Sequence, residues 1–310
     1  MLLSSARVRR SRSINFVVAI LAVTTFSPRA LRAQVTGKSG EPECPKCAEW
    51  NVPQEPFRIF GNTYFVGTHG LSAILITSNN GDVLIDGALP ESAPLIAANI
   101  AKLGFRMNDV KLIVNSHDHF DHAGGIAELQ KMSGAKVDAS PLSAPVLRRG
   151  ASSRDDPQFG LLRSYPPIKN VSVVTDGETV HVGDIALTAH FTPGHTPGGT
   201  TWTWKSCEGD TCYDMVYADS QTPGSADNFL FTRNTTYPNA IKDFERGFKV
   251  LESLSCDVLM TPHADWSGFW QRMSDSGKAN GIVDRDGCKR YAEAARQRLA
   301  KRIASEAGKE

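Results

Sequence analysis

Residues 115–125 read N-S-H-D-H-F-D-H-A-G-G and place His117, His119, Asp121 and His122 within six consecutive positions. Imidazole and carboxylate groups bind zinc in catalytic sites, where one coordination position stays open for water. In an extended stretch, side chains two residues apart face the same side, so His117 and His119 can bind one ion. Asp121 and His122 follow where the chain turns into a helix. The motif therefore predicts a site for two metal ions.

The surrounding sequence predicts where this motif lies in the fold. Residues 91–103 have apolar positions at helical spacing, and residues 110–114 form a short apolar run typical of a buried strand. Residues 123–132 have the composition of a helix. We therefore expect the metal ligands at the carboxyl edge of a strand.

Two later histidines complete the ligand set. His195 lies in T-P-G-H-T-P-G-G and His263 in M-T-P-H-A-D, each after a predicted strand and a proline turn. A solvated polar loop is the alternative for the 117–122 motif, and these two histidines disfavour it. For His69, His181 and His190 we expect a core or surface role.

The other periodic segments indicate two sheets packed face to face with helices outside. Strands are expected at residues 57–60, 63–67, 72–78 and 83–86 as an antiparallel meander, and again at 171–174, 185–191, 200–205, 213–217 and 257–260; helices are expected at 239–254 and 288–305.

Two zinc ions that share a water lower its pKa toward 7 and stabilise both the attacked carbonyl oxygen and the leaving group. Such a site hydrolyses an acyl bond without a covalent enzyme intermediate, and no G-x-S-x-G or P-loop motif competes with it. Asp121 is the expected catalytic residue, which orients the hydroxide and could relay a proton. Asp86 either binds the metal loop from behind or merely ends its strand.

Composition and the first residues set the compartment. The chain has 310 residues, 41% of them hydrophobic and 22% charged, as in a globular enzyme. Four arginines precede the apolar run 14–26, which is too short to span a bilayer. We therefore expect a signal peptide at 1–33 that is cleaved near Ala33. It would direct the protein to the periplasm, and the sequence leaves the export pathway undecided. After it we expect an extended N-terminal arm at 34–54 and one domain at 55–310.

The expected mature chain is acidic. Removing the six arginines of the signal peptide from the 34 basic residues leaves 28 against 33 acidic residues, a formal net charge of −5. Nucleic-acid binding needs clustered positive charge, so we expect no such partner.

All six cysteines follow the signal peptide, which favours disulfide bonds in an exported protein. Sequence alone leaves 15 pairings open. The spacing of Cys207 and Cys212 would close a hairpin, and Cys256 and Cys288 could join a late strand to the last helix. The Cys44-Pro-Lys-Cys47 stretch fits either a small disulfide loop or two free thiols.

The ordered motifs H-x-H-x-D-H, Gly194-His195 and Pro262-His263 resemble the metallo-β-lactamase superfamily. Further stretches are similar to its third (B-three) subclass, and the resemblance covers nearly the whole mature chain. These stretches are W-N-V-P-Q-E-P-F-R at 50–58, T-H-G-L-S at 68–72, F-G at 159–160, Y-P-P at 165–167, T-W-T-W at 201–204 and Y-A-D-S at 217–220.

The resemblance implies an αββα sandwich with two zinc ions between the sheets. It also implies a Cys256–Cys288 disulfide, and Ser220, with Thr222, contacting the substrate carboxylate. A loop at 149–167 with Phe159, Leu161 and Leu162 either walls the substrate groove or is an ordinary surface loop. The implied ligands are His117, His119 and His195 for the first zinc, and Asp121, His122 and His263 for the second.

The implied activity is hydrolysis of the β-lactam ring of penicillins, cephalosporins and carbapenems by a zinc-bound hydroxide, which confers antibiotic resistance. We expect a monomer that acts on this small molecule and has no membrane partner after signal cleavage. A lactonase or glyoxalase-like thioesterase is the alternative, favoured if Asp219 directs its carboxylate at the metals rather than Ser220 facing the groove. The mixed ligand set disfavours a non-catalytic zinc-binding protein.

Overall fold

The computed structural model describes residues 41–275 and 281–307. The predicted signal peptide, 1–33, and the start of the predicted N-terminal arm, 34–40, lie outside these ranges. Within the two described ranges, no helix has both the length and the apolar character that a bilayer crossing requires.

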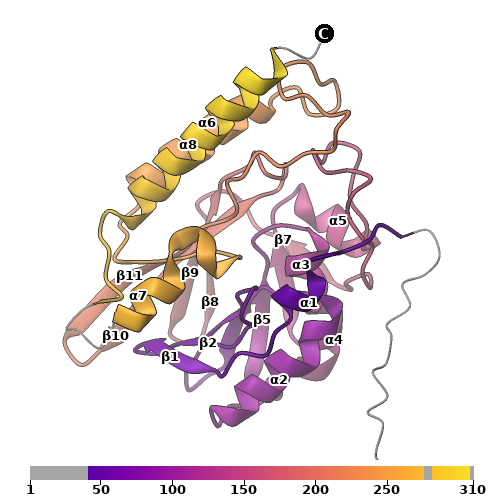
Figure 1. Cartoon of the computed structure of the whole chain (residues 1–310). Helices are drawn as coiled ribbons and strands as arrows, with labels where there is room; N and C mark the ends of the chain where they lie inside the picture. The colour runs from indigo at the N-terminus through magenta and orange to yellow at the C-terminus, as the bar shows by residue number, and fades with distance from the viewer. Residues whose placement is uncertain (1–40, 276–280, 308–310) are drawn as a thin grey trace, which may run out of the picture. The chain divides into compact units, whose positions relative to one another are not determined.

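The described residues form a first sheet of seven strands in the order β1-β2-β3-β4-β5-β6-β7 (Figure 1). Strands β1 to β4 pair antiparallel, as the predicted meander requires, and β4 to β7 pair parallel. Strand β5 is buried on both faces, which explains its nearly continuous apolar sequence V-K-L-I-V. The bounds are β1 Phe57–Phe60, β2 Thr63–Phe65, β3 Ile74–Ile76, β4 Asp82–Ile85, β5 Val110–Val114, β6 Lys136–Ala139 and β7 Val171–Val173.

The second sheet has five strands in the order β12-β11-β10-β9-β8. The pair at one edge, β11 and β12, is parallel, and the other pairs are antiparallel. The bounds are β8 Thr179–Val182, β9 Ile185–Phe191, β10 Thr200–Glu208, β11 Thr211–Tyr217 and β12 Val258–Met260.

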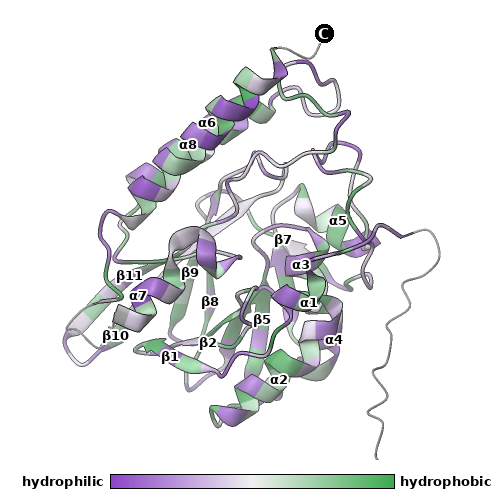
Figure 2. Cartoon of the chain, in the orientation of Figure 1, coloured by the Kyte–Doolittle hydropathy of each residue, from purple (hydrophilic) through white to green (hydrophobic). Residues whose placement is uncertain are grey.

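Helices cover the outer face of each sheet (Figure 1). Helices α2, α4 and α5 contact the first sheet, and α6 and α8 contact the second. Figure 2 shows hydrophilic and apolar residues mixed along α6 and α8, as expected for helices that bury one face. The helices are α1 Cys47–Trp50, η1 Pro90–Ser92, α2 Ala93–Lys102, η2 Met107–Asp109, α3 Phe120–Ala123, α4 Ile126–Ser133, α5 Ser143–Arg149, α6 Ala240–Ser253, η3 Ala264–Ser267, α7 Phe269–Asp275 and α8 Gly287–Glu306.

Three apolar clusters separate the layers. The first packs α2 and α4 on the first sheet, through residues such as Ile96 and Ile113. The second lies between the sheets and includes Ile85 and Trp202, and the third packs α6 and α8 on the second sheet around Phe244. The predicted four-layer αββα sandwich is therefore confirmed.

The N-terminal arm differs from its prediction as an extended segment. A disulfide joins Cys44 to Cys47, and the helical turn α1 follows at once. The backbone N–H of Trp50 donates to the carbonyl of Lys46 at 2.8 Å, so the closed loop favours a helical rather than an extended chain. That part of the prediction is wrong. The alternative left open for the two cysteines is resolved in favour of the disulfide.

Two further disulfides join the pairs that the sequence favoured. Cys207–Cys212 closes the hairpin between β10 and β11, where the two residues are directly opposed. Cys256–Cys288 joins the chain just before β12 to the first turn of α8. The Cys256–Cys288 disulfide fixes α8 beside β12, the strand that leads to His263.

Candidate metal centre

The ends of several strands bring the predicted ligands to one edge of the sandwich. His117 and His119 follow β5, and α3 begins at the next residue. His195 lies in the turn after β9, and His263 directly precedes η3 after β12. Two groups result, each with its ligand atoms within 4.8 Å of one another. They are His117, His119 and His195, and Asp121, His122 and His263.

Protein partners occupy one nitrogen of each ring in the first group. His117 Nδ1 contacts Asp219 Oδ1 at 2.8 Å, and His195 Nδ1 donates to the carbonyl of Thr222 at 2.8 Å. His119 Nε2 contacts the carboxylate of Asp156 at 2.9 Å. A nitrogen that donates a hydrogen bond cannot also be a ligand, so the opposite nitrogen of each ring is the one left for an ion.

The first group fits a metal ion by its own chemistry. Within the described residues, His117 Nε2 is buried and has no hydrogen-bond partner, and a buried polar atom in that state needs one. Burial and the neighbouring imidazoles lower the pKa of His117. Burial likewise lowers the pKa of His195 to about 3. Both rings therefore stay neutral, which is the form that binds a cation.

The second group is organised around one carboxylate oxygen. Asp121 Oδ2 lies 3.3 Å from His122 Nε2 and 3.2 Å from His263 Nε2. Burial opposes the charge of Asp121, but these two imidazoles hold its pKa well below the ordinary value. His263 is oriented through Nδ1, 3.2 Å from the carbonyl of Gly70. The His117 and His122 rings are 4.4 Å apart between centroids, so the two groups adjoin.

Asp86 supports the metal loop and also ends its strand, so both roles considered for it are present. It has a φ of 61°, a left-handed conformation that costs free energy in a non-glycine residue. Its carboxylate accepts hydrogen bonds from Ser116 N at 2.8 Å and Ser116 Oγ at 2.7 Å. Asn115 Nδ2 and the Tyr217 hydroxyl also donate to it. These bonds fix the backbone immediately before His117.

Asp219 directs its carboxylate at the far side of His117. Its Oδ1 atom contacts His117 Nδ1, the nitrogen that is not available to an ion. Its Oδ2 atom lies against Gly199, where a Cβ would come within 2.2 Å, so only glycine fits there. Burial raises the pKa of Asp219. The carboxylate therefore supports a ligand rather than joining the two groups.

Asp156 is a residue of the site that sequence reasoning missed. Its Oδ2 atom contacts His119 Nε2 at 2.9 Å, and its Oδ1 atom accepts from Gln158 N at 2.7 Å. Burial lowers the pKa of His119, but the adjacent Asp156 carboxylate outweighs it and raises the pKa to about 9. A metal ion would have to displace that proton. The Asp-Pro pair at Asp156 signals a turn and nothing about its partner.

A cavity of about 350 Å³ opens over both groups. Ser220 and Thr222, for which substrate contact stays a prediction, line this cavity, and Leu161 and Leu162 form part of its wall. Of the two alternatives for this loop, Phe159 does not fit the groove wall, since it borders a separate cavity. Other lining residues are Trp50, Phe120, Gln158, Gly224 and Trp266.

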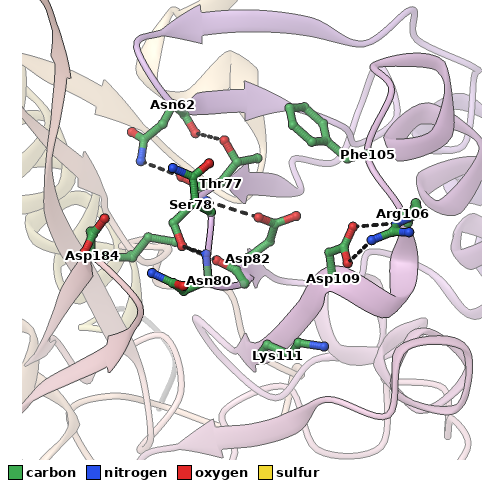
Figure 3. Close-up of a pocket in the computed structure, with 13 residues that line it drawn as sticks. Asn62, Thr77, Ser78, Asn80, Asp82, Phe105, Arg106, Asp109, Lys111 and Asp184 are labelled. Atoms are coloured by element: carbon green, nitrogen blue, oxygen red, sulfur yellow. Dashed lines mark hydrogen bonds and ion pairs between the residues drawn. The ribbon is translucent and has the colours of Figure 1, made fainter.

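A larger cavity, of about 660 Å³, lies elsewhere (Figure 3). Its lining includes Asn62, Ser78 and Asp82, and an ion pair between Arg106 and Asp109 closes one side. None of its lining residues belongs to either metal-binding group. Volume is therefore a poorer guide to the site than chemistry.

The chain is similar to known proteins over most of its length. The family model described as the Metallo-beta-lactamase superfamily matches residues 66–239. Among solved structures, the Rm3 metallo-beta-lactamase is 52% identical with a TM-score of 0.84, covering 86% of this chain and 99% of that one. MEM-A1, a subclass B3 metallo-beta-lactamase from a soil metagenome library, is 48% identical with a TM-score of 0.83, covering 84% and 100%. SMB-1 is 44% identical with a TM-score of 0.80, covering 83% and 99%.

Curated relatives match over shorter stretches. An uncharacterised protein, YobT of Bacillus subtilis, is 32% identical over 145 residues, 45% of this chain and 59% of YobT. A hydroxyacylglutathione hydrolase of Rhodopseudomonas palustris is 36% identical over 107 residues, 34% of this chain and 32% of the hydrolase. The chain therefore spans less than two thirds of the length of these relatives.

Proposed function

This chain belongs to the metallo-beta-lactamase superfamily, and we propose that it is a zinc-dependent hydrolase that opens the β-lactam ring of penicillins, cephalosporins and carbapenems, conferring antibiotic resistance. Proteins named as metallo-beta-lactamases are 44–52% identical to it and align over almost their full length. A small-molecule substrate also suits a cavity of about 350 Å³.

The donor set suits two zinc ions per chain. His117, His119 and His195 would hold one, and Asp121, His122 and His263 the other. When bound, the two ions supply a water that reacts at neutral pH and a Lewis acid for the carbonyl oxygen and the leaving nitrogen.

The chain's own side chains orient the reaction. Oδ2 of Asp121 faces Nε2 of His122 and Nε2 of His263 and would be the ligand atom of this carboxylate, so Oδ1 would orient the attacking water and accept its proton. The hydroxyls of Ser220 and Thr222 would bind the substrate carboxylate. Thr222 Oγ1 lies 3.0 Å from His195 Nδ1, and as the acceptor in that contact it keeps its own hydrogen for the substrate.

The positions of Asp219 and Ser220 are the observation that favours a β-lactam substrate over a thioester or a lactone. A thioesterase or lactonase reading, suggested by the hydroxyacylglutathione hydrolase match, needs an aspartate directed at both metals. Asp219 instead contacts His117 from the side away from the ion, while Ser220 lines the cavity. This arrangement favours β-lactams over thioesters and lactones.

The compartment rests on the sequence pattern. Residues 1–33 fit a cleaved signal peptide, and three disulfides among the described residues suit an oxidising compartment such as the periplasm. We expect residues 55–310 to form the enzyme domain and the exported enzyme to act as a monomer.

A substrate panel tests the proposal. The purified protein is stripped with chelator, reloaded with zinc, and assayed on a penicillin, a cephalosporin and a carbapenem beside a lactone and a thioester. We expect β-lactam turnover to disappear with the metal and to return with zinc. Turnover of the lactone or thioester without the carbapenem would overturn the assignment.

A further inference from the structure

The chain segment at 219–222, called here the Ser220 segment, carries contacts to both sides of the first metal-binding group. The carboxylate of its first residue contacts His117, and the carbonyl of its last residue accepts from His195, each at 2.8 Å. Ser220 lines the cavity between them. The segment has no helix or strand of its own, so other contacts must fix its backbone.

One side chain from a distant element holds the backbone on both sides of Ser220. The hydroxyl of Tyr291, on α8, donates to the carbonyl oxygen of Asp219 at 3.1 Å and accepts from the backbone N–H of Gln221 at 3.1 Å. Tyr291 is buried, and burial raises its pKa, so the hydroxyl keeps the proton that it donates. A single oxygen therefore ties two flanking peptide groups to the helix.

Helix α8 is anchored near both of its ends. The Cys256–Cys288 disulfide lies one turn before Tyr291. At the other end, the buried carboxylate of Glu306 accepts from the backbone N–H of Phe231 at 3.0 Å. Tyr291 thus projects from a support that is fixed to the second half of the fold.

We propose that Tyr291 is a positioning residue for substrate binding, which acts by holding the hydroxyl of Ser220 where the substrate carboxylate binds. The inference rests on the proposed β-lactamase function, and Tyr291 itself is absent from the cavity lining. Without its hydroxyl, the buried carbonyl of Asp219 and the buried N–H of Gln221 lose their partner, and the two peptide groups that flank Ser220 shift to regain one while the contacts to His117 and His195 remain.

The test is Tyr291→Phe in the zinc-loaded protein, assayed on a penicillin and a carbapenem. Loss of one hydrogen-bonding hydroxyl should raise KM about three- to tenfold. We expect kcat to stay within about twofold and the zinc content to stay unchanged. In the Ser220→Ala background the same substitution should raise KM no further. Additive effects of the two substitutions would overturn the proposal.

Leu299→Ala is the matched control, because Leu299 is buried on α8 and its side chain makes no hydrogen bond to the segment. We expect it to lower the unfolding temperature without changing KM. An equal rise in KM would mean that general loosening of α8, rather than the Tyr291 hydroxyl, is responsible.

Amide hydrogen exchange separates this inference from the proposed function. The Gln221 amide should be protected in the unmutated protein, exchange faster in Tyr291→Phe and remain protected in Leu299→Ala. If the unmutated protein hydrolyses no β-lactam, the proposed function fails while this measurement still tests the contact. Fast exchange of the Gln221 amide in the unmutated protein would overturn the role of Tyr291, even if the variant does not fold.

Discussion

The contact between His117 Nδ1 and Asp219 leaves His117 Nε2 as the nitrogen that can bind an ion. We expect His117→Ala to lose zinc from the first group, because only two ligands remain there. Its β-lactamase activity should fall by more than the roughly 10–100-fold typical of removing a ligand's supporting partner. Metal analysis and steady-state kinetics measure both effects. His181→Ala, at an exposed histidine outside both groups, should match the unmutated protein. Full activity of His117→Ala would contradict the ligand assignment.

Asp219 and Ser220 are neighbours with separable roles. Asp219→Asn keeps an oxygen that can accept from His117 but removes the carboxylate charge that supports this ring as a ligand, so zinc affinity should fall about 10–100-fold. Ser220→Ala should keep its zinc affinity and instead raise KM for β-lactams. Competition with a chromogenic chelator measures the affinity of both variants. Equal zinc affinity in Asp219→Asn and the unmutated chain would show that the His117 contact does not support the metal.

Asp82 provides a test far from the metal centre. Burial raises its pKa, so the charged form is disfavoured in the folded chain. The contribution of protonated Asp82 to the free energy of unfolding is therefore fully present below pH 3.8, and it is lost as pH rises through the pKa of the folded state. Asp82→Asn keeps the acceptor for Ser78 N and removes the charge. We expect the variant to unfold at higher denaturant concentration than the parent at pH 7, with the difference shrinking toward pH 4.

Asp109→Asn should behave in the opposite way. The hydrogen bonds from Arg106 lower the pKa of Asp109, so its charged form is favoured in the folded chain. The contribution of Asp109 is present above pH 3.8 and is lost as pH falls through the lowered value. Removal of this charge in Asp109→Asn should slightly lower the denaturant concentration at which the folded chain unfolds at pH 7. If both variants changed the unfolding midpoint at pH 7 in the same direction, the opposite pKa shifts of Asp82 and Asp109 would not explain the changes.

Among the elements, sequence periodicity located the long or strongly apolar ones. The bounds of β5 and β9 match their predictions, because apolar or alternating residues fill each strand from end to end. Strands β6 and β8 and helices α5 and α7 were not predicted. Each is short and has no run of more than two apolar residues, so no apolar pattern marks it in the sequence.

The candidate site divides in a similar way. Six ligand candidates were identified from sequence because four lie within six consecutive positions and the other two follow proline turns, and the structure brings all six together. Asp156 and Tyr291 were not identified. Their partners are 37 and 72 residues away, and only the folded backbone decides those pairings. Supporting contacts are thus the part of the site that a single sequence hides.

The link between β12 and α8 should contribute more to stability than the link across the β10–β11 hairpin. A disulfide limits the unfolded chain more when it closes a longer loop, and the separations are 32 and 5 residues. The chain-entropy model gives about 4 and about 2 kcal/mol. We therefore expect the Cys256→Ser/Cys288→Ser pair to reduce the free energy of unfolding more than Cys207→Ser/Cys212→Ser. Equal losses in urea unfolding would contradict this order.

In the molecule as a whole, the metal centre joins the two sheets. His117 and His119 follow a strand of the first sheet, whereas His195 and His263 follow strands of the second. An ion held by both would bind the folded chain and not the unfolded one, adding about 2.7 kcal/mol per site at a hundredfold excess over its Kd. Zinc should therefore raise the unfolding temperature in calorimetry, in proportion to the logarithm of its concentration, and chelator should reverse the shift. His117→Ala should show a smaller shift because the first ion loses its attachment to β5 through that residue. An unchanged unfolding temperature in chelator, with zinc removal verified by metal analysis, would mean that the apolar cluster between the sheets holds them together without the ions.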